Sequence, residues 1–458
     1  MRQALLRFAR ATVWCGATAL GSAAQTPHTL AYAPGKSITL SLPGELDINI
    51  AASGLRRVRF FARSPDGRIF VTGMHDLSDN REGSVFILEG WDAKAHTFTH
   101  VTHYLDGLRN PNNLAFWTYP ATHQSWLYLP LTEKLVRYKY SAGDHAPASS
   151  PETLMRFPDY GLSYKYGGWH LTRTVAIASV HGVPRVFVAA GSSCNYCQER
   201  EVLRAAIVSM DPDGKHPSLV AQGMRNAVDL HSVSALDGRL FATNMGDDHL
   251  GDRLPEDTFF AIDTGSAVPK NYGWPTCYFA LGKAVHDTTP LPALNDEHAM
   301  AAIPRDSVYG KQSGVAAAGK NLTAGGGHIF AADPNAELGQ APAPLSSCES
   351  VPAAYTTFAA HSSPLGLEYF GGADSLLARS FLVALHGASH PHIGTGYRVV
   401  RFSPADRRPR DFIIGFLTVE GGKPFVHGRP CGILRVGPDS FLLSDDYLGL
   451  VYFIHPRG

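Results

Sequence analysis

The chain has 458 residues, and its 40 Lys and Arg balance its 40 Asp and Glu, so the formal net charge is zero. A nucleic-acid-binding protein needs an excess of cations to displace phosphate counterions, so the composition argues against nucleic acid as a partner. Hydrophobic residues make up 44% of the chain, which excludes global disorder. With 45 Gly, 31 Pro and only 17% charged residues, we expect many short strands rather than long solvated helices.

The first 24 residues have the pattern of an export signal. Arg2, Arg7 and Arg10 supply positive charge, residues 11–20 are mostly small and apolar, and residues 22–24 are small residues at the expected cleavage positions. The apolar run is too short to span a bilayer, and no later segment approaches 18 uninterrupted apolar residues. We therefore predict a signal peptide over residues 1–24 and a periplasmic or secreted mature chain without a membrane span.

Two kinds of turn recur along the chain. In the first kind, Asp, Gly and Pro stand beside a short β-prone run, because tight turns need positive φ or a side chain that caps its own backbone. These turns are 64–67, 211–214, 236–239 and 437–440. In the second kind, a loop with Arg or Pro precedes an apolar run. These loops are 107–111, 223–226, 363–367 and 428–430.

Such self-similarity is typical of a radial β-repeat. Six units fit, near residues 55–100, 101–145, 165–200, 203–263, 358–403 and 411–456. We predict an all-β fold, a six-bladed β-propeller of four-stranded antiparallel blades with long connecting loops. It occupies residues 55–458, follows an N-terminal extension over 25–54, and contains a long loop insertion over 278–347.

Five cysteines remain after signal removal. Cys194 and Cys197 form a lone C-x-x-C, whereas a structural zinc site needs four ligands and a redox dithiol would need a thioredoxin-like βαβ context. A tight-loop disulfide between them is therefore expected. Cys277 and Cys348 could close a long loop, which leaves Cys431 without a partner.

A set of short phrases, in order from about residue 55 to the end, resembles the soluble quinoprotein sugar dehydrogenases, specifically their sorbosone or aldose-sugar dehydrogenase branch. The phrases are His-Leu-Thr-Arg-Thr at 170–174, Gly-Ser-Ser-Cys-Asn-Tyr-Cys at 191–197, Gly-Met-Arg-Asn at 223–226, the Asp-rich loop 246–252, Asn-Tyr-Gly-Trp-Pro-Thr-Cys-Tyr at 271–278, His-Ser-Ser-Pro-Leu-Gly-Leu at 361–367, Gly-Tyr-Arg-Val-Val at 396–400 and Ser-Asp-Asp-Tyr at 444–447. Members of that family are six-bladed propellers that use pyrroloquinoline quinone (PQQ) and calcium. The resemblance implies an exported dehydrogenase of an aldose or a related polyol or aldehyde, with a separate electron acceptor.

The resemblance also assigns the catalytic and cofactor-binding residues. It implies that His170 is the general base, since His has a pKa near working pH, and that Arg173 anchors a neighbouring group. Arg225 and Arg429 would bind PQQ carboxylates as guanidinium forks. The further cofactor-binding residues are Asn226 and Trp274, and Arg109 holds the place equivalent to Arg225 and Arg429 in an earlier unit.

The metal is expected at the Asp-rich loop. Calcium takes oxygen ligands, including backbone carbonyls, and the resemblance implies Gly246, Asp247 and Asp248, with Asp252 nearby. A second cluster offers nitrogen ligands, which favour zinc or copper. Its members are His386, His390 and His392.

The chain departs from the family's pattern at three places. His-Gly-Ala-Ser-His-Pro at 386–391 stands where the family has His-Gly-Ser-Trp-Asn-Arg, Ala227 replaces a Pro, and 257–259 replaces Glu-Leu-Asn. Two alternatives therefore stay open. One is a catalytically silent propeller that binds a glycan or a protein, and the other is a lactonase with Asp247 and Asp248 as metal ligands.

Overall fold

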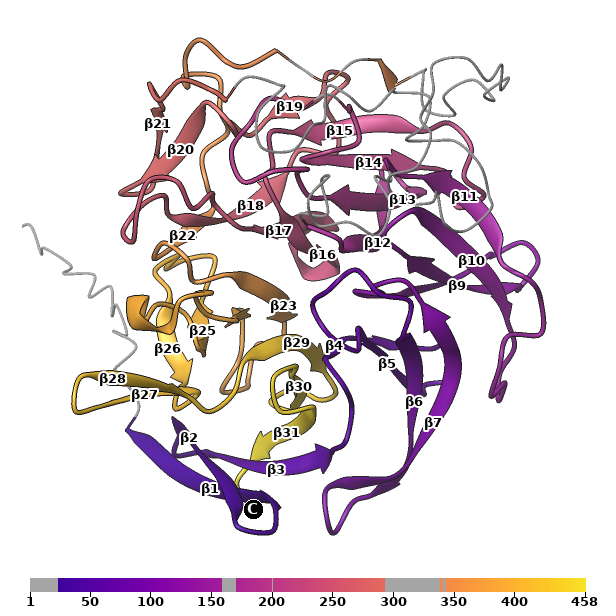
Figure 1. The fold of residues 1–458 in the computed structure, drawn as a ribbon. Helices are drawn as coiled ribbons and strands as arrows, with labels where there is room; N and C mark the ends of the chain where they lie inside the picture. The colour runs from indigo at the N-terminus through magenta and orange to yellow at the C-terminus, as the bar shows by residue number, and fades with distance from the viewer. Residues whose placement is uncertain (1–23, 159–169, 200, 293–337, 340, 342) are drawn as a thin grey trace, which may run out of the picture.

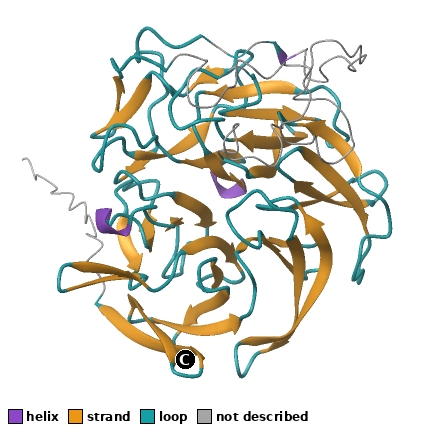
Figure 2. Ribbon diagram, in the orientation of Figure 1, coloured by secondary structure: helices purple, strands orange, loops and turns teal. Residues whose placement is uncertain are grey.

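A computed structural model describes residues 24–158, 170–199, 201–292, 338–339, 341 and 343–458. The predicted signal peptide, except residue 24, lies outside these ranges, as does most of the predicted 278–347 insertion. Within the described ranges the fold is all-β, with only short 3₁₀ segments such as η2 (Ser234–Leu236) and η5 (Pro391–Ile393) (Figure 2). No helix in this part of the chain is long and apolar enough to cross a membrane.

Six antiparallel sheets form the blades of a ring (Figure 1), which confirms the predicted six-bladed propeller. The first three blades are β4 (Val58–Arg63), β5 (Ile69–Gly73), β6 (Gly83–Asp92) and β7 (Thr97–Leu108); β8 (Ala115–Thr118), β9 (Ser125–Pro130), β10 (Lys134–Tyr140) and β11 (Glu152–Arg156); and β12 (Arg173–Val180), β13 (Val183–Ala190), β14 (Ala206–Met210) and β15 (Ser218–Gln222). The last three are β16 (Ala227–Val233), β17 (Arg239–Asn244), β18 (Asp257–Ile262) and β22 (Thr356–Phe358); β23 (Pro364–Phe370), β24 (Ser380–Leu385), β25 (Arg398–Phe402) and β26 (Arg410–Ile413); and β29 (Pro430–Arg435), β30 (Phe441–Asp445), β31 (Leu450–Pro456) and β3 (Leu46–Ala52).

The first strand of each blade lines the centre of the ring. These inner strands contact one another in the order β4, β8, β12, β16, β23, β29 and back to β4. The predicted turns connect the strands as expected. Asp237 and Gly238 both have positive φ (58° and 67°) in the turn before β17, and Gly67 and Gly214 have φ of +89° and +86°.

The sixth blade corrects the predicted N-terminal boundary. Its fourth strand is β3, which pairs antiparallel with β31 from the C-terminus. Residues 46–52 were assigned to an extension outside the ring, but they close it. The rest of that segment forms the hairpin of β1 (Gln25–Ala33) and β2 (Lys36–Pro43), whose Leu40 and Leu42 pack with Phe412 and Ile413 of the fifth blade.

Two other predicted boundaries are displaced. The third blade runs to the end of β15, so β14 and β15 do not belong to the unit that starts near residue 203. The long loop 191–205 joins two strands of one blade instead of separating two blades. The fourth blade is interrupted between β18 and β22, so the insertion begins at residue 263 and not at 278.

The insertion contributes short strands outside the ring. β19 (Lys270–Asn271) adds a parallel strand to the third blade, and β20 (Cys277–Ala280) pairs with β21 (Lys283–His286). A further hairpin, β27 (Leu417–Glu420) and β28 (Lys423–Val426), precedes the sixth blade. Disulfides join Cys194 to Cys197 and Cys277 to Cys348, as expected, and Cys431 is free and buried.

Candidate functional site

One face of the ring collects the residues that the sequence analysis singled out. In a four-stranded blade, the loop entering the first strand and the loop joining the second and third strands lie at the same end. His170, Arg225 and Arg429 precede β12, β16 and β29, and the 246–248 segment joins β17 to β18. We call this end of the ring the site face.

His170 is placed by groups on its own and the neighbouring loop. Its Nδ1 lies 3.1 Å from the carbonyl oxygen of Ser192 and 3.0 Å from Ser192 Oγ. A carbonyl only accepts hydrogen bonds, so the geometry assigns the proton to Nδ1 and the lone pair to Nε2. Burial, and then the nearby charge of Arg225, lower the pKa of His170 well below its usual value. The imidazole is therefore a neutral base at neutral pH.

Arg173 is completely buried and stabilises the backbone beside His170. Its Nη1 donates to the carbonyl oxygens of His170 (2.7 Å) and Thr172 (2.9 Å), and its guanidinium lies over the ring of Phe157. His170 has a left-handed φ of 48°, a conformation that needs such support in a non-glycine residue. Arg173 is thus a positioning residue.

Asn226 lies beside His170. A Cβ atom at Gly191 would collide with both the Oδ1 of Asn226 and the Cβ of His170, so the two side chains meet over this glycine. The Asn226 backbone N–H donates to Asn244 Oδ1 at 3.0 Å, which fixes the loop. The structure therefore brings together the predicted base and the predicted amide.

Arg225 is buried among loop groups that accept its hydrogen bonds. Nε donates to the Asn195 carbonyl (3.0 Å), Nη2 to Asn195 Oδ1 (2.7 Å), and Nη1 to the Gly246 carbonyl (2.5 Å). Nη2 also lies 3.4 Å from Asp248 Oδ2. Burial lowers the pKa of Arg225. Its donors connect two site-face loops rather than pointing away from the protein.

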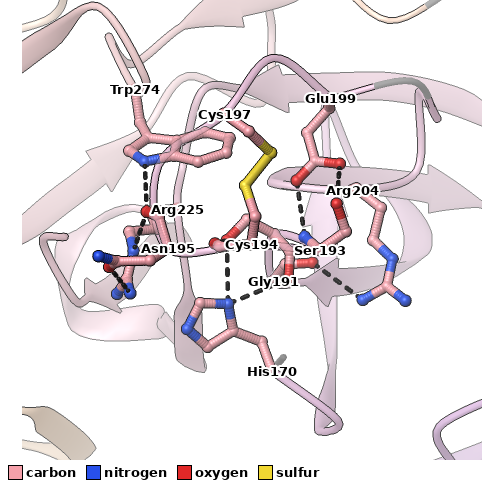
Figure 3. Close-up of a disulfide and its surroundings, with 11 residues drawn as sticks. His170, Gly191, Ser193, Cys194, Asn195, Cys197, Glu199, Arg204, Arg225 and Trp274 are labelled. Atoms are coloured by element: carbon pink, nitrogen blue, oxygen red, sulfur yellow. Dashed lines mark hydrogen bonds between the residues drawn. A yellow bond between two sulfur atoms is a disulfide. The ribbon is translucent and has the colours of Figure 1, made fainter. Parts of the chain in front are cut away.

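Asn195, inside the Cys194–Cys197 disulfide, is the residue that the sequence analysis missed (Figure 3). Besides its two bonds from Arg225, it accepts the Asp248 N–H at Oδ1 (2.9 Å) and Trp274 Nε1 at its carbonyl (3.3 Å). Trp274, predicted to contact the cofactor, packs against the disulfide loop with Cys194. An Asn between two closely spaced cysteines was the available signal.

The predicted metal ligands lie against histidine and arginine side chains. Asp247 Oδ1 lies 2.7 Å from His249 Nδ1, whose Nε2 lies 2.7 Å from Asp287 Oδ2. His249 also stacks on Tyr196 with ring centroids 3.8 Å apart, and although burial opposes the shift, the neighbouring carboxylates of Asp247 and Asp287 raise its pKa. Asp247 is therefore the first carboxylate of an Asp247–His249–Asp287 chain, in which the Asp247 Oδ1–His249 Nδ1 contact lacks hydrogen-bond geometry.

Asp248 is the exposed member of the predicted metal set. Its Oδ1 lies 3.0 Å from His361 Nδ1, and His361 Nε2 contacts the Gly251 carbonyl. The hydrogen bond with Asp248, opposed by burial, raises the pKa of His361 to about 9. Among described residues, the close group of potential metal ligands is Cys194, Cys197 and Glu199, and its cysteines are in a disulfide.

A second constellation lies on the fifth and sixth blades. Arg429 donates to the carbonyls of Gly387 (2.9 Å) and Ala388 (3.0 Å) and to the Tyr397 hydroxyl (2.9 Å). In the described ranges it has no carboxylate partner. Its guanidinium stabilises the 386–397 loop and leaves a positive charge on the site face.

His386 is the buried member of the predicted histidine cluster. Its Nε2 lies 2.8 Å from Asp446 Oδ1, and Asp446 also accepts a hydrogen bond from Arg59 at 3.0 Å. Burial lowers the pKa of His386, although Asp446 opposes the shift. His390 and His392 lie on the exposed loop with ring centroids 5.8 Å apart, so the structure does not gather the three histidines around one point.

Arg109 and Asp252 are separate from the two constellations. Arg109 donates to both carboxylate oxygens of Asp79, at 2.7 Å from Nε and 2.6 Å from Nη2. It is a buried ion pair of the first two blades, not a ligand-facing fork. Asp252 lies at the exposed end of the β17–β18 loop.

Comparisons with known proteins are consistent with this architecture. The TrAA12-like family model matches residues 119–411, more than half of the chain. No curated protein matches the chain in sequence. Among solved structures, similar ones include the holo PQQ domain of pyranose dehydrogenase from Coprinopsis cinerea, which is 15% identical with a TM-score of 0.59 over 92% of this chain and 97% of that one.

Two further structures are similar. The calcium structure of a family AA12 carbohydrate-active enzyme from Trichoderma reesei is 14% identical with a TM-score of 0.59 over 91% of this chain and 96% of that one. The apo soluble aldose sugar dehydrogenase from Escherichia coli is 12% identical with a TM-score of 0.51 over 90% of this chain and 100% of that one. At these identities the likeness shows the fold.

Proposed function

Because the chain belongs to the TrAA12-like family, we propose that it is an exported quinoprotein oxidoreductase that oxidises an aldose, or a related polyol or aldehyde, with PQQ. The pyranose dehydrogenase PQQ domain and the aldose sugar dehydrogenase that share its fold support this class. Protein side chains cannot accept a hydride, so the reaction needs such a cofactor. The motifs at 170–174 and 223–226 favour the sorbosone or aldose-sugar branch.

The single observation that carries the proposal is the pairing of His170 with Asn226 over Gly191 on the site face. A neutral imidazole with its lone pair on Nε2 is suited to remove a proton from a sugar hydroxyl. The adjacent amide can hydrogen-bond a carbonyl oxygen of a bound partner molecule.

The charge of the site face fits PQQ, which has three carboxylates. Arg429 has a guanidinium without a carboxylate partner in the described ranges, and Arg225 shares one exposed carboxylate, Asp248. Both guanidiniums already donate to loop carbonyls, so we expect them to attract PQQ mainly by charge. Asn226 would hydrogen-bond a quinone oxygen, and Trp274 would support the loop behind Arg225.

The residues of this chain prepare the proton transfer. When bound, PQQ would supply the acceptor for the hydride from the sugar carbon. Ser192 holds the proton on His170 Nδ1, so that Nε2 accepts the proton of the sugar hydroxyl. Arg173 keeps the His170 backbone in place, and burial keeps the imidazole neutral before the transfer.

The predicted calcium ligands do not fit a cation in the observed arrangement. The Gly246 carbonyl accepts a hydrogen bond from the guanidinium of Arg225, and the two Asp carboxylates are paired with His249 and His361. A further cation at this place would be repelled by the guanidinium of Arg225 and by the protonated ring of His361. We therefore derive no step through calcium, and the same pairings weigh against the lactonase alternative.

Electrons are proposed to leave to a separate acceptor. Gln198 follows Cys197, so the C-x-x-C motif is not a haem-attachment site. The proposed location, periplasmic or secreted, rests on the signal pattern of residues 1–24. The two disulfides are compatible with an oxidising compartment.

Reconstitution tests the proposal. The purified protein is incubated with PQQ, with and without Ca²⁺, desalted, and assayed with a dye acceptor against a panel of aldoses, polyols and lactones. We expect retained quinone absorbance and dye reduction with at least one aldose. Loss of all quinone absorbance together with no turnover would refute it. Sugar binding without turnover would then favour the catalytically silent propeller. Lactone hydrolysis that a chelator abolishes would favour the lactonase.

A further inference from the structure

A second pocket opens on the face of the ring opposite to the site face. Its volume is about 960 Å³, and it is lined by the β16–β17 turn, the β23–β24 turn and the β25–β26 turn. These turns join first to second and third to fourth strands, so they lie at the end of the blades away from His170. The pocket is therefore separate from the proposed catalytic site.

Arginines dominate the charge of this pocket. The lining contains four arginines, Arg379, Arg401, Arg408 and Arg410, and one carboxylate, Asp406. Arg408 and Arg410 both bind Asp406, with Arg408 Nε at 2.8 Å and Arg410 Nη2 at 3.2 Å. The single carboxylate cannot neutralise four guanidiniums, so the pocket keeps an excess of positive charge.

Arg401 lines the pocket from a strand rather than from a turn. It projects from β25, and its Nε donates to Ser380 Oγ at 2.8 Å. Neither Arg401 nor Arg379 forms an ion pair within the described part of the chain. Arg401 is half-buried, and burial lowers its pKa, with the carboxylate of Asp439 opposing the shift. Asp439 itself accepts the backbone N–H groups of residues 376 and 377.

A cationic lining is not a general property of clefts between blades. The equivalent cleft between the sixth and first blades has a volume of about 500 Å³ and is lined by Trp91, Phe98 and Phe453, with Arg63, Arg68 and Glu89 at its polar part. There, Arg68 is paired with Asp66 at 3.0 Å. The pocket between the fourth and fifth blades thus differs by having four arginines for one carboxylate, against two arginines for one carboxylate in the other cleft.

We propose that the pocket lined by Arg379, Arg401, Arg408 and Arg410 binds a small organic molecule with two or more oxyanion groups. Guanidinium groups bind carboxylate and phosphoryl oxygens with paired hydrogen bonds. The volume is within the range of pockets for small organic ligands and exceeds what a single inorganic ion fills. Leu236 and Tyr369 supply an apolar wall for the carbon skeleton of the ligand.

Calorimetric titration of the full chain tests this site. Citrate tests ligands with carboxylates, and fructose 1,6-bisphosphate tests ligands with phosphoryl groups. Inorganic phosphate tests binding of a bare ion, and sucrose is the neutral control. All titrations are made at constant ionic strength. We expect one ligand per chain for citrate or the bisphosphate, with Arg401→Gln weakening binding at least tenfold. Arg398→Gln is the matched control, because Arg398 lies on the same strand but pairs with Asp411 at 2.8 Å.

Several outcomes would overturn the proposal that this pocket binds an anionic ligand. They are no binding beyond the effect of salt, equal binding of sucrose, tight binding of phosphate alone, or unchanged affinity in Arg401→Gln. If Arg401→Gln does not fold, Arg379→Asn replaces it, since Arg379 is exposed and its φ of 49° suits Asn. This variant should also weaken binding, and unchanged affinity would reject the proposal. The result is independent of PQQ and of sugar oxidation.

Discussion

His170 and His386 lie on the same face of the ring, on the third and fifth blades, and each is close to an arginine that stabilises a loop. They differ in what their ring nitrogens contact. His170 Nδ1 faces a backbone carbonyl and a hydroxyl, whereas His386 Nε2 faces the carboxylate of Asp446. The surroundings of the two rings therefore suit them to different tasks.

The contact of His170 with the Ser192 carbonyl fixes its Nδ1 proton, which under the proposed function lets Nε2 accept a substrate proton. The contact of His386 places it in a buried network with Asp446, Arg59 and Arg57. In this network burial opposes the shift, but His386 and the two arginines together lower the pKa of Asp446. Such a network stabilises the junction of the fifth, sixth and first blades. The comparison teaches that the group facing one ring nitrogen, a carbonyl at His170 and a carboxylate at His386, decides which nitrogen holds the proton and how the ring is oriented.

The largest expected effect is on turnover. In protein reconstituted with PQQ, His170→Ala should lower kcat by about 10³-fold, because general-base catalysis contributes about 10²–10⁴-fold. KM should change little. His386→Ala should lower kcat less than tenfold when both variants show the parent's circular dichroism. The reverse ranking would exchange the roles of the two histidines.

The disulfides should differ in their effect on stability. Cys277 and Cys348 are 71 residues apart, so replacing both with Ser should lower the free energy of unfolding by about 4 kcal/mol. Cys194 and Cys197 are 3 residues apart, and their replacement should cost about 2 kcal/mol. The shorter loop bears Asn195, so only its loss should also weaken PQQ binding. Denaturant unfolding and quinone absorbance after desalting measure the two effects.

Replacing the two site-face arginines should lower the stability of the protein by different amounts. Arg225→Gln removes hydrogen bonds to Asn195 and Gly246 and should lower the free energy of unfolding by about 3 kcal/mol. Arg429→Gln should cost about 2 kcal/mol, since the 386–397 loop has other anchors, such as the Tyr397 hydroxyl bond to Ala388. Urea unfolding at pH 7 measures both. Equal stability of Arg225→Gln and the parent would contradict the inference that Arg225 holds the site-face loops together.

The smallest effect is the pH dependence of stability. The folded-state pKa of both histidines is lowered, so the unfolded chain binds more protons as the pH falls below about 6.5. Stability should then fall by up to about 1.4 kcal/mol per pH unit per histidine. His170→Gln should remove more of this slope than His386→Gln, because Asp446 opposes the shift of His386. Urea unfolding between pH 5 and 7 gives the slope of stability against pH for each variant. A steeper slope in His170→Gln than in His386→Gln would contradict the larger pKa shift assigned to His170.

Part of the site could be predicted because it depends on position in the repeat. A loop that enters an inner strand always ends at the same face, so recognising the phrases before β12, β16 and β29 was enough to place His170, Arg225 and Arg429 on one face, although Arg429 belongs to a second constellation there. The partners of these side chains could not be predicted. Arg225 binds Asn195 from another blade, and Asp247 binds His249, which pairs with Asp287 of the insertion. Such contacts depend on loop conformations that no local pattern encodes.

The sequence by itself determined the all-β repeat, the turn positions, the pairing of Cys194 with Cys197 and the face that carries the candidate residues. These features follow from local rules, since a tight turn selects Asp and Gly and a strand selects apolar residues. Only the tertiary structure decided that β3 closes the ring and that the predicted calcium ligands face histidine and arginine side chains. It also assembled the arginines of the opposite pocket from three turns. Each of these depends on contacts between segments far apart in the chain, where geometry rather than spacing decides which charges meet.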